Sequence, residues 1–527
     1  MEKKGKNKRK LPPAKDAKET EEPAQEESKV SSVIEEVKTN PEPKQEQQRE
    51  ETKEIKGEVK DQRASNMPLM AQELKDLLEL LEKEMAKESM PLHEHEKTML
   101  RESLKTDRFK QGVEIVKKAL RKRDENKAAD HLEDIQPLFD PHAFWDDQPV
   151  PKLGEDVTLS DDQFDKPIEV KTVDQVQKEP YGLPPGYEWD NIDLKDDAVA
   201  KEMYDLLTQN YVEDEDALFR FDYSVPFLRW SLLLPDYNPD WLVCVRGGKK
   251  KKMFGCITGI PVTMSVNGKT VKMTEINFLC VHKNLRAKRL APVLIKEITR
   301  RVNLTDTWQA IYTAGVTIPT PFTGATYWHR GINIKKLCDV RFLGVPSGTT
   351  MAKFIKTKAL PTNISNQRMR PMEKKDIPEV TVMLNDYLAK VKVHIVYTQE
   401  EIAHFMMPQQ DVVYSYVVDD EDGKITDFHS FYCLPSSILQ HAGYDTLRVA
   451  YSWYQVSNSD NLTRNMRDLL ILAKQNDFDV FNALDVMENS SFLEELKFGI
   501  GDGRLHYYFY NYRVKGIKPK DVGMVLV

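Results

Sequence analysis

The chain has 527 residues, of which 40% are hydrophobic and 30% are charged, and its formal net charge at pH 7 is −8. The length predicts two or three domain-sized units, and the composition supports a sizeable core plus a polar segment outside it. The negative charge argues against a DNA- or RNA-binding protein, and the lack of a run of about 18 apolar residues argues against a transmembrane segment.

Residues 1–66 are rich in Lys, Glu, Gln and Pro and contain almost no aromatic side chains. Such a segment cannot bury enough apolar surface to offset its ordering entropy, so we expect a disordered, charged tail. Its first ten residues lack the apolar core of a secretory signal and carry a cluster of six basic side chains. A solvated tail is the simpler interpretation of this cluster, and an electrostatic tether to RNA or a ribosome is the alternative.

The sequence pattern of residues 67–134 predicts a helical region. Residues 67–90 carry leucines and a methionine at helical spacing, and a second helical pattern lies near residues 107–124. We expect both helices to pack on the body of the protein rather than to bind a partner.

The globular region begins near residue 135 with the extended, proline-marked segment FWDDQPVPKLGE, and a loop follows to about Pro185. A helix is expected at 195–209, followed by the acidic stretch 213–216. Strands are expected at 241–246, 253–260, 261–266 and 272–281. Glycines 247 and 248 mark a turn that carries a solvated lysine run, and Asn267 with Gly268 predicts a hairpin turn.

The rest of the chain suggests a weak internal repeat. The first half predicts a strand at 275–281, a basic loop, a helix at 291–302, a strand at 309–315, a helical stretch containing YWHR and a strand at 338–342. The second half predicts a strand at 447–456, a loop, a helix at 462–475, a strand at 478–486, a helix at 489–498 and a strand at 505–514. The common order predicts two similar α/β (α+β) units.

Cysteine is scarce, and the number of cysteines is odd. No two have metal-ligand spacing, and none suggests a disulfide framework, so we expect free thiols in a reducing compartment and no metal site. The five cysteines are Cys244, Cys256, Cys280, Cys338 and Cys433.

A candidate anion site follows the strand that ends near Val281. The loop HKNLRAKRL is basic and leads into a helix, whose first N–H groups have no partner within the helix and attract negative charge. Arg286, Lys288 and Arg289 add positive charge suited to a pyrophosphate. Neither GxxxxGK[ST] nor GxGxxG occurs, which argues against nucleotide triphosphatases and dinucleotide enzymes. An ordinary basic turn between strand and helix is the alternative.

Long sequence blocks resemble a known family. Residues 275–292 and the block KFGIGDGRLHYYFYNY are similar to the two signatures of the eukaryotic N-myristoyltransferases, or glycylpeptide N-tetradecanoyltransferases. Further similar blocks include NYVEDEDALFRFDYS, RPMEKKDIP, YSWYQV and FNALDVMEN, and the similarity runs from about residue 142 to the last residue. The resemblance implies transfer of a myristoyl group from myristoyl-CoA to the N-terminal glycine of proteins.

The resemblance also implies the architecture. Two tandem acetyltransferase-like (GNAT) units would form one compact body, with residues 135–345 binding acyl-CoA and residues 346–527 binding the peptide. We expect a cytosolic monomer, with no DNA or metal bound and with direct attack of the glycine amine on the thioester. Two alternatives remain open: a short-chain N-acetyltransferase, and a non-catalytic acyl-CoA-binding or ribosome-associated protein.

By this resemblance, the backbone amides of Phe278 and Leu279 form an oxyanion hole, and the neighbouring Cys280 and Val281 adjoin the cofactor. Three residues would cover coenzyme A, namely Ala143, Phe144 and Trp145. The phosphates would be bound by Arg286, Ala287, Lys288, Arg289, Leu290, Ala291 and Pro292. Ala287 and Ala143 depart from the family pattern, where a serine and a polar residue are frequent.

The reaction needs a base, because a glycine amine is mostly protonated at neutral pH. The family uses the C-terminal carboxylate, here that of Val527, and the apolar end GMVLV suggests that burial raises its pKa. Asn277 and Thr313 match positions that steer the amine. The peptide groove would include Tyr211, Tyr327, His329 and Ser452. Three acidic positions would attract a basic substrate residue, namely Asp214, Asp216 and Asp502.

Overall fold

The computed structural model describes residues 142–152, 155, 159–212, 217–286, 288–459 and 461–526. The expected tail (residues 1–66) and the expected helical region (residues 67–134) lie outside these residues, so both remain predictions. All statements below on what is present or absent concern the described residues.

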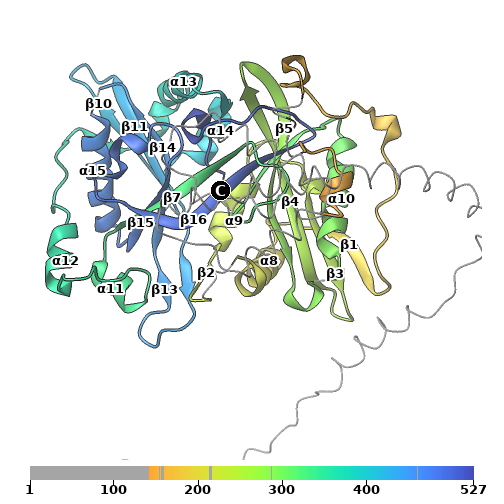
Figure 1. Ribbon diagram of the computed structural model, residues 1–527, viewed down its shortest axis with the longest axis horizontal. Coiled ribbons are helices and arrows are strands. Elements are labelled where there is room, and N and C mark those ends of the chain that lie inside the picture. The colour runs from red at the N-terminus through yellow and green to blue at the C-terminus, as the bar shows by residue number, and fades with distance from the viewer. Residues whose placement is uncertain are drawn as a thin grey trace, which may run out of the picture. The chain divides into compact units, whose positions relative to one another are not determined.

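Fourteen strands of the described residues form one mixed sheet, and three more form a small antiparallel sheet (Figure 1). Along the main path the strands are β1 (Tyr187–Asn191), β3 (Leu242–Gly247), β4 (Lys252–Val266), β5 (Lys269–Val281), β6 (Ala310–Ala314), β16 (Gly499–Tyr510), β7 (Thr323–Gly331), β15 (Val480–Leu484), β14 (Val449–Ser457), β11 (Ile425–Cys433), β10 (Val413–Asp419) and β8 (Met369–Pro371). Off this path, β9 (Val393–Ile395) pairs with β4 and with β17 (Val522–Gly523). The small sheet contains β13 (Thr446–Leu447), β12 (Ser436–Ile438) and β2 (Phe219–Phe221).

Two parallel strand pairs in this sheet have the same construction. In the first half, β5 and β6 are parallel and are connected through α10 (Leu290–Asn303). In the second half, β14 and β15 are parallel and are connected through α15 (Leu462–Gln475). This strand–helix–strand correspondence confirms the central part of the internal repeat.

Outside this strand–helix–strand part, the predicted internal repeat is wrong. The YWHR segment is not helical but belongs to β7, which pairs with β15 on one side and β16 on the other. The strand contains Thr323, Thr326, Tyr327 and Trp328, and β-branched and aromatic residues of this kind favour a paired strand. Residues 338–342 do not form a strand either, because Cys338 and Asp339 end the short helix α11 (Ile334–Asp339) and Arg341 has a left-handed φ of 65°.

The sheet extends through both halves because β16 lies between β6 and β7. Although β6 and β7 are neighbours in sequence, each pairs with β16 and not with the other. In Figure 1 these central strands join the green first half to the blue second half. One large cluster of buried side chains accordingly contains Met264 of β4, Tyr454 of β14 and Leu526.

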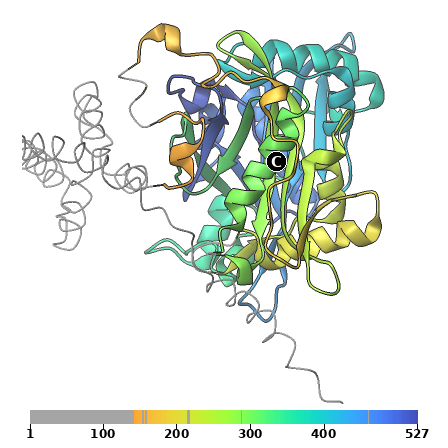
Figure 2. The same ribbon diagram turned by 90° about the vertical axis from the view of Figure 1, so that its right-hand side faces the viewer.

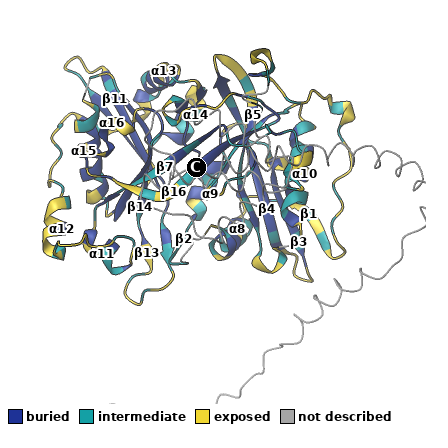
Figure 3. Ribbon diagram, viewed as in Figure 1, coloured by how far each residue is buried: buried dark blue, intermediate teal, exposed yellow. Residues whose placement is uncertain are grey.

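Helices cover the sheet, and strands β3, β4, β10, β11, β14 and β15 are buried over most of their length (Figure 3). Helix α10 packs against β4 and β5, and α15 packs against β14 and β11. The remaining helices of four or more residues are α8 (Asp197–Asn210), α9 (Val225–Leu232), α12 (Met351–Lys358), α13 (Ile377–Leu388), α14 (Gln399–Phe405) and α16 (Ser490–Leu493). At the start of the described region, the expected extended segment contains a short 3-10 helix at Trp145–Asp147.

Residues 253–260 and 261–266, expected as two strands, form the single strand β4, which runs through Pro261. Proline has no N–H group and usually breaks a ladder. Here β3 pairs with β4 only as far as Thr258, and β9 begins to pair at Met264. Pro261 therefore lies where one edge of β4 has no partner strand, so its missing donor leaves the ladder intact.

The C-terminal segment is held in the interior, near the centre of the views in Figures 1 and 2. Strand β17 pairs in parallel with β9. After it, Trp453 Nε1 donates to the Val525 carbonyl at 3.1 Å, and Tyr507 Oη donates to the Met524 carbonyl at 3.3 Å. Met524, Val525 and Leu526 are buried, which agrees with the apolar end of the sequence.

Candidate active site

A large cavity among the described residues has a volume of about 750 Å³ and is lined by residues from both halves. One wall comes from β5, β6 and α10 of the first half, and the opposite, second-half wall comes from β14, β15 and β16 together with β7. Most of the lining side chains are apolar or aromatic. The sequence-predicted residues in its wall are Trp145, Tyr211, Asn277, Phe278, Leu279, Thr313, Tyr327, His329 and Asp502.

A β-bulge shapes the first-half wall. Phe278 has a left-handed φ of 52°, and the register between β4 and β5 shifts so that Phe278 and Leu279 together lie opposite Ile257. A bulge turns the backbone out of the ladder, as it often does beside active sites. In addition, β5 pairs with β6 only at Thr274 and Glu275, so the two strands diverge before the bulge. The bulge backbone consequently lies at the cavity, where donors for a developing oxyanion are required.

Two β4 side chains support this bulge. Thr258 Oγ1 donates to the Asn277 carbonyl at 3.0 Å, and Cys256 Sγ donates to the Phe278 carbonyl at 3.2 Å. Both donors are fully buried. They supply the partners that the shifted ladder cannot provide, and they fix the orientation of the peptide planes at the bulge.

The basic loop leads into α10, where the sequence predicts an anion site. Arg289, with a left-handed φ of 59°, is the N-cap residue, and no side chain caps the helix. The first amides of α10 therefore remain available to an anion, with Lys288 and Arg289 exposed beside them. The guanidinium of Arg286 donates instead to the carbonyl of Asn210, whose side chain accepts from the Lys283 amide at 2.8 Å.

Three aromatic rings are stacked beside the cavity. Tyr312 lies between Trp145, at 5.9 Å between ring centroids, and Tyr508, at 5.1 Å. The hydroxyl of Tyr312 is buried without a hydrogen-bond partner among the described residues. Trp145 thus lines the cavity next to a polar atom that a bound ligand can satisfy.

The second-half wall is polar around His329. Its Nδ1 is 2.7 Å from Asn482 Oδ1, and burial lowers its pKa. A neutral His329 therefore donates through Nδ1 and presents Nε2 as an acceptor. The backbone of Gly501 packs so closely that an added Cβ would lie 2.3 Å from His329 Nε2.

The two candidate tyrosines of the groove, Tyr211 and Tyr327, line the cavity and are partly buried. Burial raises the pKa of Tyr327 to about 12. Burial also raises the pKa of Tyr211, and a backbone hydrogen bond from Phe278 opposes part of that rise. Both phenols are consequently neutral hydrogen-bonding groups rather than bases at neutral pH.

The other predicted residues lie elsewhere. Phe144 packs edge-on against Trp145 at 5.0 Å, and Ser452 is buried on β14, where it accepts from Gln455 Nε2 at 3.1 Å. The residues that do not line the cavity are Ala143, Phe144, Cys280, Val281, Arg286, Lys288, Arg289, Leu290, Ala291, Pro292 and Ser452. Four predicted residues lie outside the described residues, namely Val527, Asp214, Asp216 and Ala287.

The cavity wall also contains residues that the sequence did not single out. Leu526 lines it, and Asn482 and Tyr312 contribute polar groups. Asn482 lies within the family-like block FNALDVMEN, which is the one signal that could have pointed to it. The stacking of Tyr312 depends on segments far apart in sequence and leaves no local signal.

A membrane-spanning helix and a metal site are both absent from the described residues. No helix there is long and apolar enough to cross a membrane. No group of three or more His, Cys, Asp or Glu side chains there is arranged to hold a metal ion.

Comparison with known proteins gives consistent matches. Residues 167–325 match the family described as "Myristoyl-CoA:protein N-myristoyltransferase, N-terminal domain", and residues 339–525 match its C-terminal domain. Glycylpeptide N-tetradecanoyltransferase 1 of Arabidopsis thaliana is 49% identical over 390 residues, which are 73% of this chain and 89% of that protein. The Dictyostelium discoideum glycylpeptide N-tetradecanoyltransferase is 47% identical and covers 73% of this chain and 92% of its own length.

A solved structure agrees with the sequence matches. The crystal structure of Saccharomyces cerevisiae N-myristoyltransferase with bound myristoyl-CoA is 39% identical to this chain and superimposes with a TM-score of 0.70. The match covers 73% of this chain and 99% of the yeast chain.

Proposed function

Because the chain belongs to the myristoyl-CoA:protein N-myristoyltransferase family, it transfers a myristoyl group from myristoyl-CoA to the N-terminal glycine of proteins, and we propose how its own residues do so. One observation carries the proposal. The bulge at Phe278 and Leu279, the polar Asn277 and Thr313, and Leu526 line one apolar cavity.

The chemistry is direct acyl transfer. The glycine nitrogen attacks the thioester carbonyl carbon and forms a C–N bond, and the carbonyl electrons move to oxygen. The backbone amides of the Phe278–Leu279 bulge stabilise this oxyanion. When the carbonyl re-forms, the C–S bond breaks and the thiolate of coenzyme A leaves. Asn277 and Thr313 orient the amine during the attack.

The acyl donor binds mainly to the first half, residues 135–345. We assign the binding of its phosphates to the uncapped start of α10 with Lys288 and Arg289. Trp145, which lines the cavity, is the residue that we assign to cover the bound acyl-CoA. The acyl chain then lies in the apolar part of the cavity. A myristoyl chain has about twelve more methylenes than acetyl, and at about 0.8 kcal/mol each their full burial favours it by up to about 10 kcal/mol.

The peptide contacts mainly the second half, residues 346–527, together with β7. Tyr327, His329 and Asp502 lie in the cavity wall on that side. Asp502 gives this side of the site a negative charge that selects peptides with a basic residue, and the family resemblance assigns the same role to Asp214 and Asp216, which lie outside the described residues. Tyr211 completes the wall between the two substrates, and Ser452 supports it from within β14.

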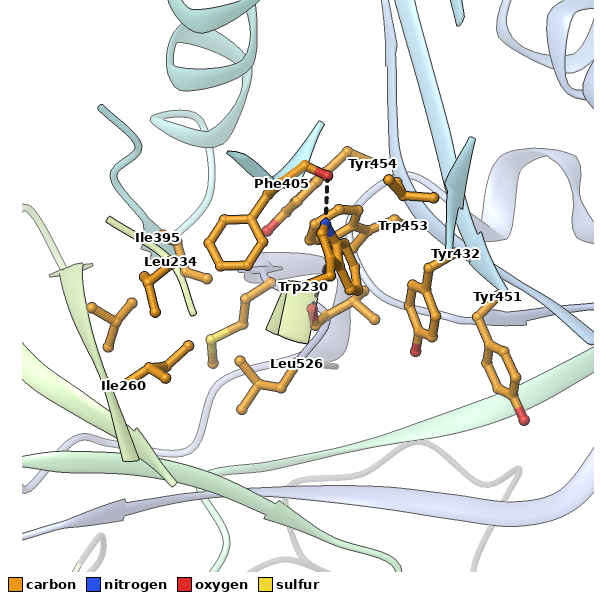
Figure 4. Close-up of a cluster of buried hydrophobic side chains, with 14 of the residues drawn as sticks. Trp230, Leu234, Ile260, Ile395, Phe405, Tyr432, Tyr451, Trp453, Tyr454 and Leu526 are labelled. Carbon is orange, nitrogen blue, oxygen red and sulfur yellow. Dashed lines mark hydrogen bonds between the residues drawn. The ribbon is translucent and has the colours of Figure 1, made fainter. Parts of the chain in front are cut away.

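The proton acceptor that we assign is the terminal carboxylate of Val527. Leu526, the preceding residue, lines the cavity and packs beside Trp453 and Trp230 (Figure 4). Hydrogen bonds from Trp453 and Tyr507 fix the two residues before it. A carboxylate added to this buried strand would lose hydration, which raises its pKa towards neutrality and makes it a better base.

Acyl transfer to a glycine-initiated octapeptide tests this function. The full chain should transfer myristate from myristoyl-CoA, whereas a chain lacking Leu526 and Val527 should lose at least about 100-fold in kcat, the contribution of a general base. Leu526→Ala, which keeps a terminal carboxylate at residue 527, is the matched control and should lose much less. Equal rates for the full and truncated chains would assign the base elsewhere, and no transfer by the full chain would refute the function.

We further propose that the enzyme acts as a cytosolic monomer and that its basic N-terminal cluster tethers it to the ribosome. Two observations support this setting: the described cysteines are all free thiols, and nascent chains present new N-terminal amines. Cosedimentation with ribosomes should decrease with salt and should be lost when the six basic residues are replaced by serine. Salt-independent cosedimentation, or none, would contradict the tether.

A further inference from the structure

Glu275 is a buried carboxylate in the family-like segment that the mechanism above does not use. It lies on β5, three residues before the bulge, with an exposure of only 5%. Its register partners are apolar, namely Ile260 on β4 and Ile311 on β6. Within the described residues no lysine or arginine pairs with it, so an acidic group is kept beside the reaction centre without a counter-ion.

Asn277 is the hydrogen-bond partner of this carboxylate. Its Nδ2 donates to Glu275 Oε1 at 2.7 Å. Asn277 lines the large cavity, whereas Glu275 lines a separate small cavity of about 20 Å³ behind it. The Asn277 side chain therefore connects the reaction centre to a buried acid that substrate does not touch.

This contact determines which end of the Asn277 amide faces the substrate. An ionised carboxylate can only accept hydrogen bonds, so the amide must present its NH2 group to Glu275. The amide oxygen is then directed away from Glu275 and remains free to accept from the incoming amine. A glycine amine or ammonium donates hydrogen bonds, so this orientation is the productive one.

The other groups around Glu275 do not stabilise its charge. Tyr397, which follows β9, and Tyr454 of β14 interact with it electrostatically, and their hydroxyls lie 3.0 Å from each other. Glu401 of α14 and the apolar Val525 line the same small cavity. Burial raises the pKa of Glu275 to about 7, and the Asn277 hydrogen bond only partly opposes the rise.

On the basis of the proposed function, we propose that Glu275 is a positioning residue, which holds the Asn277 amide oxygen towards the substrate amine as long as its carboxylate is ionised. A protonated Glu275 carries an O–H donor, and its partner Asn277 offers it an acceptor only when the amide oxygen turns towards Glu275. The amide then turns and presents its NH2 group to the amine, which opposes productive binding. Peptide turnover should therefore decline as Glu275 takes up its proton.

The test compares Glu275→Gln and Glu275→Met with the full wild-type chain between pH 6 and pH 9, with myristoyl-CoA and a glycine-initiated octapeptide. Glutamine offers Asn277 the same acceptor without a titrating proton, whereas methionine offers none. We expect Glu275→Met to lower kcat/KM for the peptide more than tenfold at pH 8 and to leave the KM for myristoyl-CoA within about twofold. Glu275→Gln should stay within about threefold of wild type at pH 8.

The decisive readout is the ratio of Glu275→Gln to wild-type kcat/KM as a function of pH, because the substrate amine titrates equally in both reactions. This ratio should rise at least threefold between pH 8 and pH 6. Glu401→Gln, which changes an acid of the same small cavity, should give a constant ratio. A constant ratio for Glu275→Gln, or wild-type peptide kinetics for Glu275→Met, would overturn the proposal.

Two results would distinguish a failure of the Glu275 proposal from loss of the enzyme activity or of the fold. If wild type transfers no myristate, the proposed function fails and not the role of Glu275 alone. If Glu275→Met does not bind myristoyl-CoA, it has lost its fold, and the isosteric Glu275→Gln profile decides. A merely structural Glu275 would change thermal stability without changing the pH ratio.

Discussion

The hydroxyl of Thr258 shows how much of the site depends on a side chain that substrate never meets. It is buried on β4 and donates to the carbonyl of Asn277, immediately before the bulge. With Cys256, it fixes the backbone that carries both the proposed oxyanion donors and the residue proposed to orient the amine. Catalysis by fixed dipoles requires such support, because a donor that must reorient during the reaction loses much of its effect.

Replacement of Thr258 by valine should lower kcat without a matching loss of substrate binding. Valine has nearly the same shape but leaves the Asn277 carbonyl without its partner, and a net hydrogen bond is worth about 1 kcal/mol, or about fivefold in rate. Steady-state kinetics with both substrates measure this effect. Thr258→Ser, which keeps the hydroxyl, is the control, and its kcat should remain within about twofold of the wild-type value. An unchanged kcat for the valine variant would show that Thr258 does not contribute to catalysis.

At the scale of elements, the start of α10 combines an uncapped helix with two exposed basic side chains. Lys288→Glu should raise the KM for myristoyl-CoA about tenfold at low salt and leave kcat nearly unchanged, because it acts on binding of the phosphates alone. Lys296→Glu reverses one exposed charge further along the same helix and is the matched control. The difference between the two variants should shrink as salt increases. Equal KM values for myristoyl-CoA in the two variants would show that the phosphates do not bind at this site.

A second element-scale prediction concerns the junction of β8 and α13. Arg370 contacts the buried Asp376 at 2.7 Å and Asp419 at 2.8 Å. Burial acts to raise the pKa of Asp376, but hydrogen bonds from Arg370 and the Glu373 amide outweigh burial and lower the pKa. Asp376→Asn should therefore reduce the free energy of unfolding by about 3 kcal/mol at pH 7, as removal of one member of a buried pair does.

The pH dependence of this loss follows from the lowered pKa. The unfolded chain protonates Asp376 at a higher pH than the folded chain does, so the contribution is complete above the ordinary pKa near 3.8 and disappears as pH falls through the folded value. Urea unfolding at pH 7 and near pH 2 should show the gap between variant and wild type closing in acid. Asp419→Asn, which changes a more exposed partner of Arg370, should cost less. A gap that persists in acid would contradict this assignment.

Elements with strong local signals could be predicted from the sequence. The helix at residues 462–475 matches α15 in its bounds, and the Asn267 and Gly268 pair forms the expected turn with positive φ at both residues. The predictions failed where tertiary pairing decides the conformation. The YWHR segment is a strand because it lies between two others, and Pro261 is tolerated because neighbouring strands leave a gap there.

For the site, the sequence predicted the segment around the bulge because the family signature lies there. It could not predict the pairing of Asn277 with Glu275, the support by Thr258 or the Tyr312 stack. Each of these depends on contacts between side chains in space, which neither periodicity nor spacing encodes. Likewise, no local pattern indicates that Ser452 supports the wall from within β14 instead of lining it.

At the scale of the whole molecule, the continuous sheet joins the two halves proposed to bind acyl-CoA and peptide. The largest buried cluster contains side chains from both halves, so neither half can open without exposing it. We therefore expect amides of β4 and β14 to exchange hydrogen with the same opening free energy, and we expect myristoyl-CoA to protect both equally. Native-state hydrogen exchange measures this. Two separate opening energies would show that the halves unfold independently.

The place of β16 between β6 and β7 has a consequence for synthesis of the chain. Strands β6 and β7 are complete by residue 331, but the strand that pairs with both spans Gly499–Tyr510. During synthesis on the ribosome, the backbone groups of β6 and β7 that later pair with β16 stay unpaired until nearly 170 further residues have been added. Open edges of this kind recruit other strands and promote aggregation. The order of translation thus makes the newborn protein dependent on chaperone shielding until its last strands emerge.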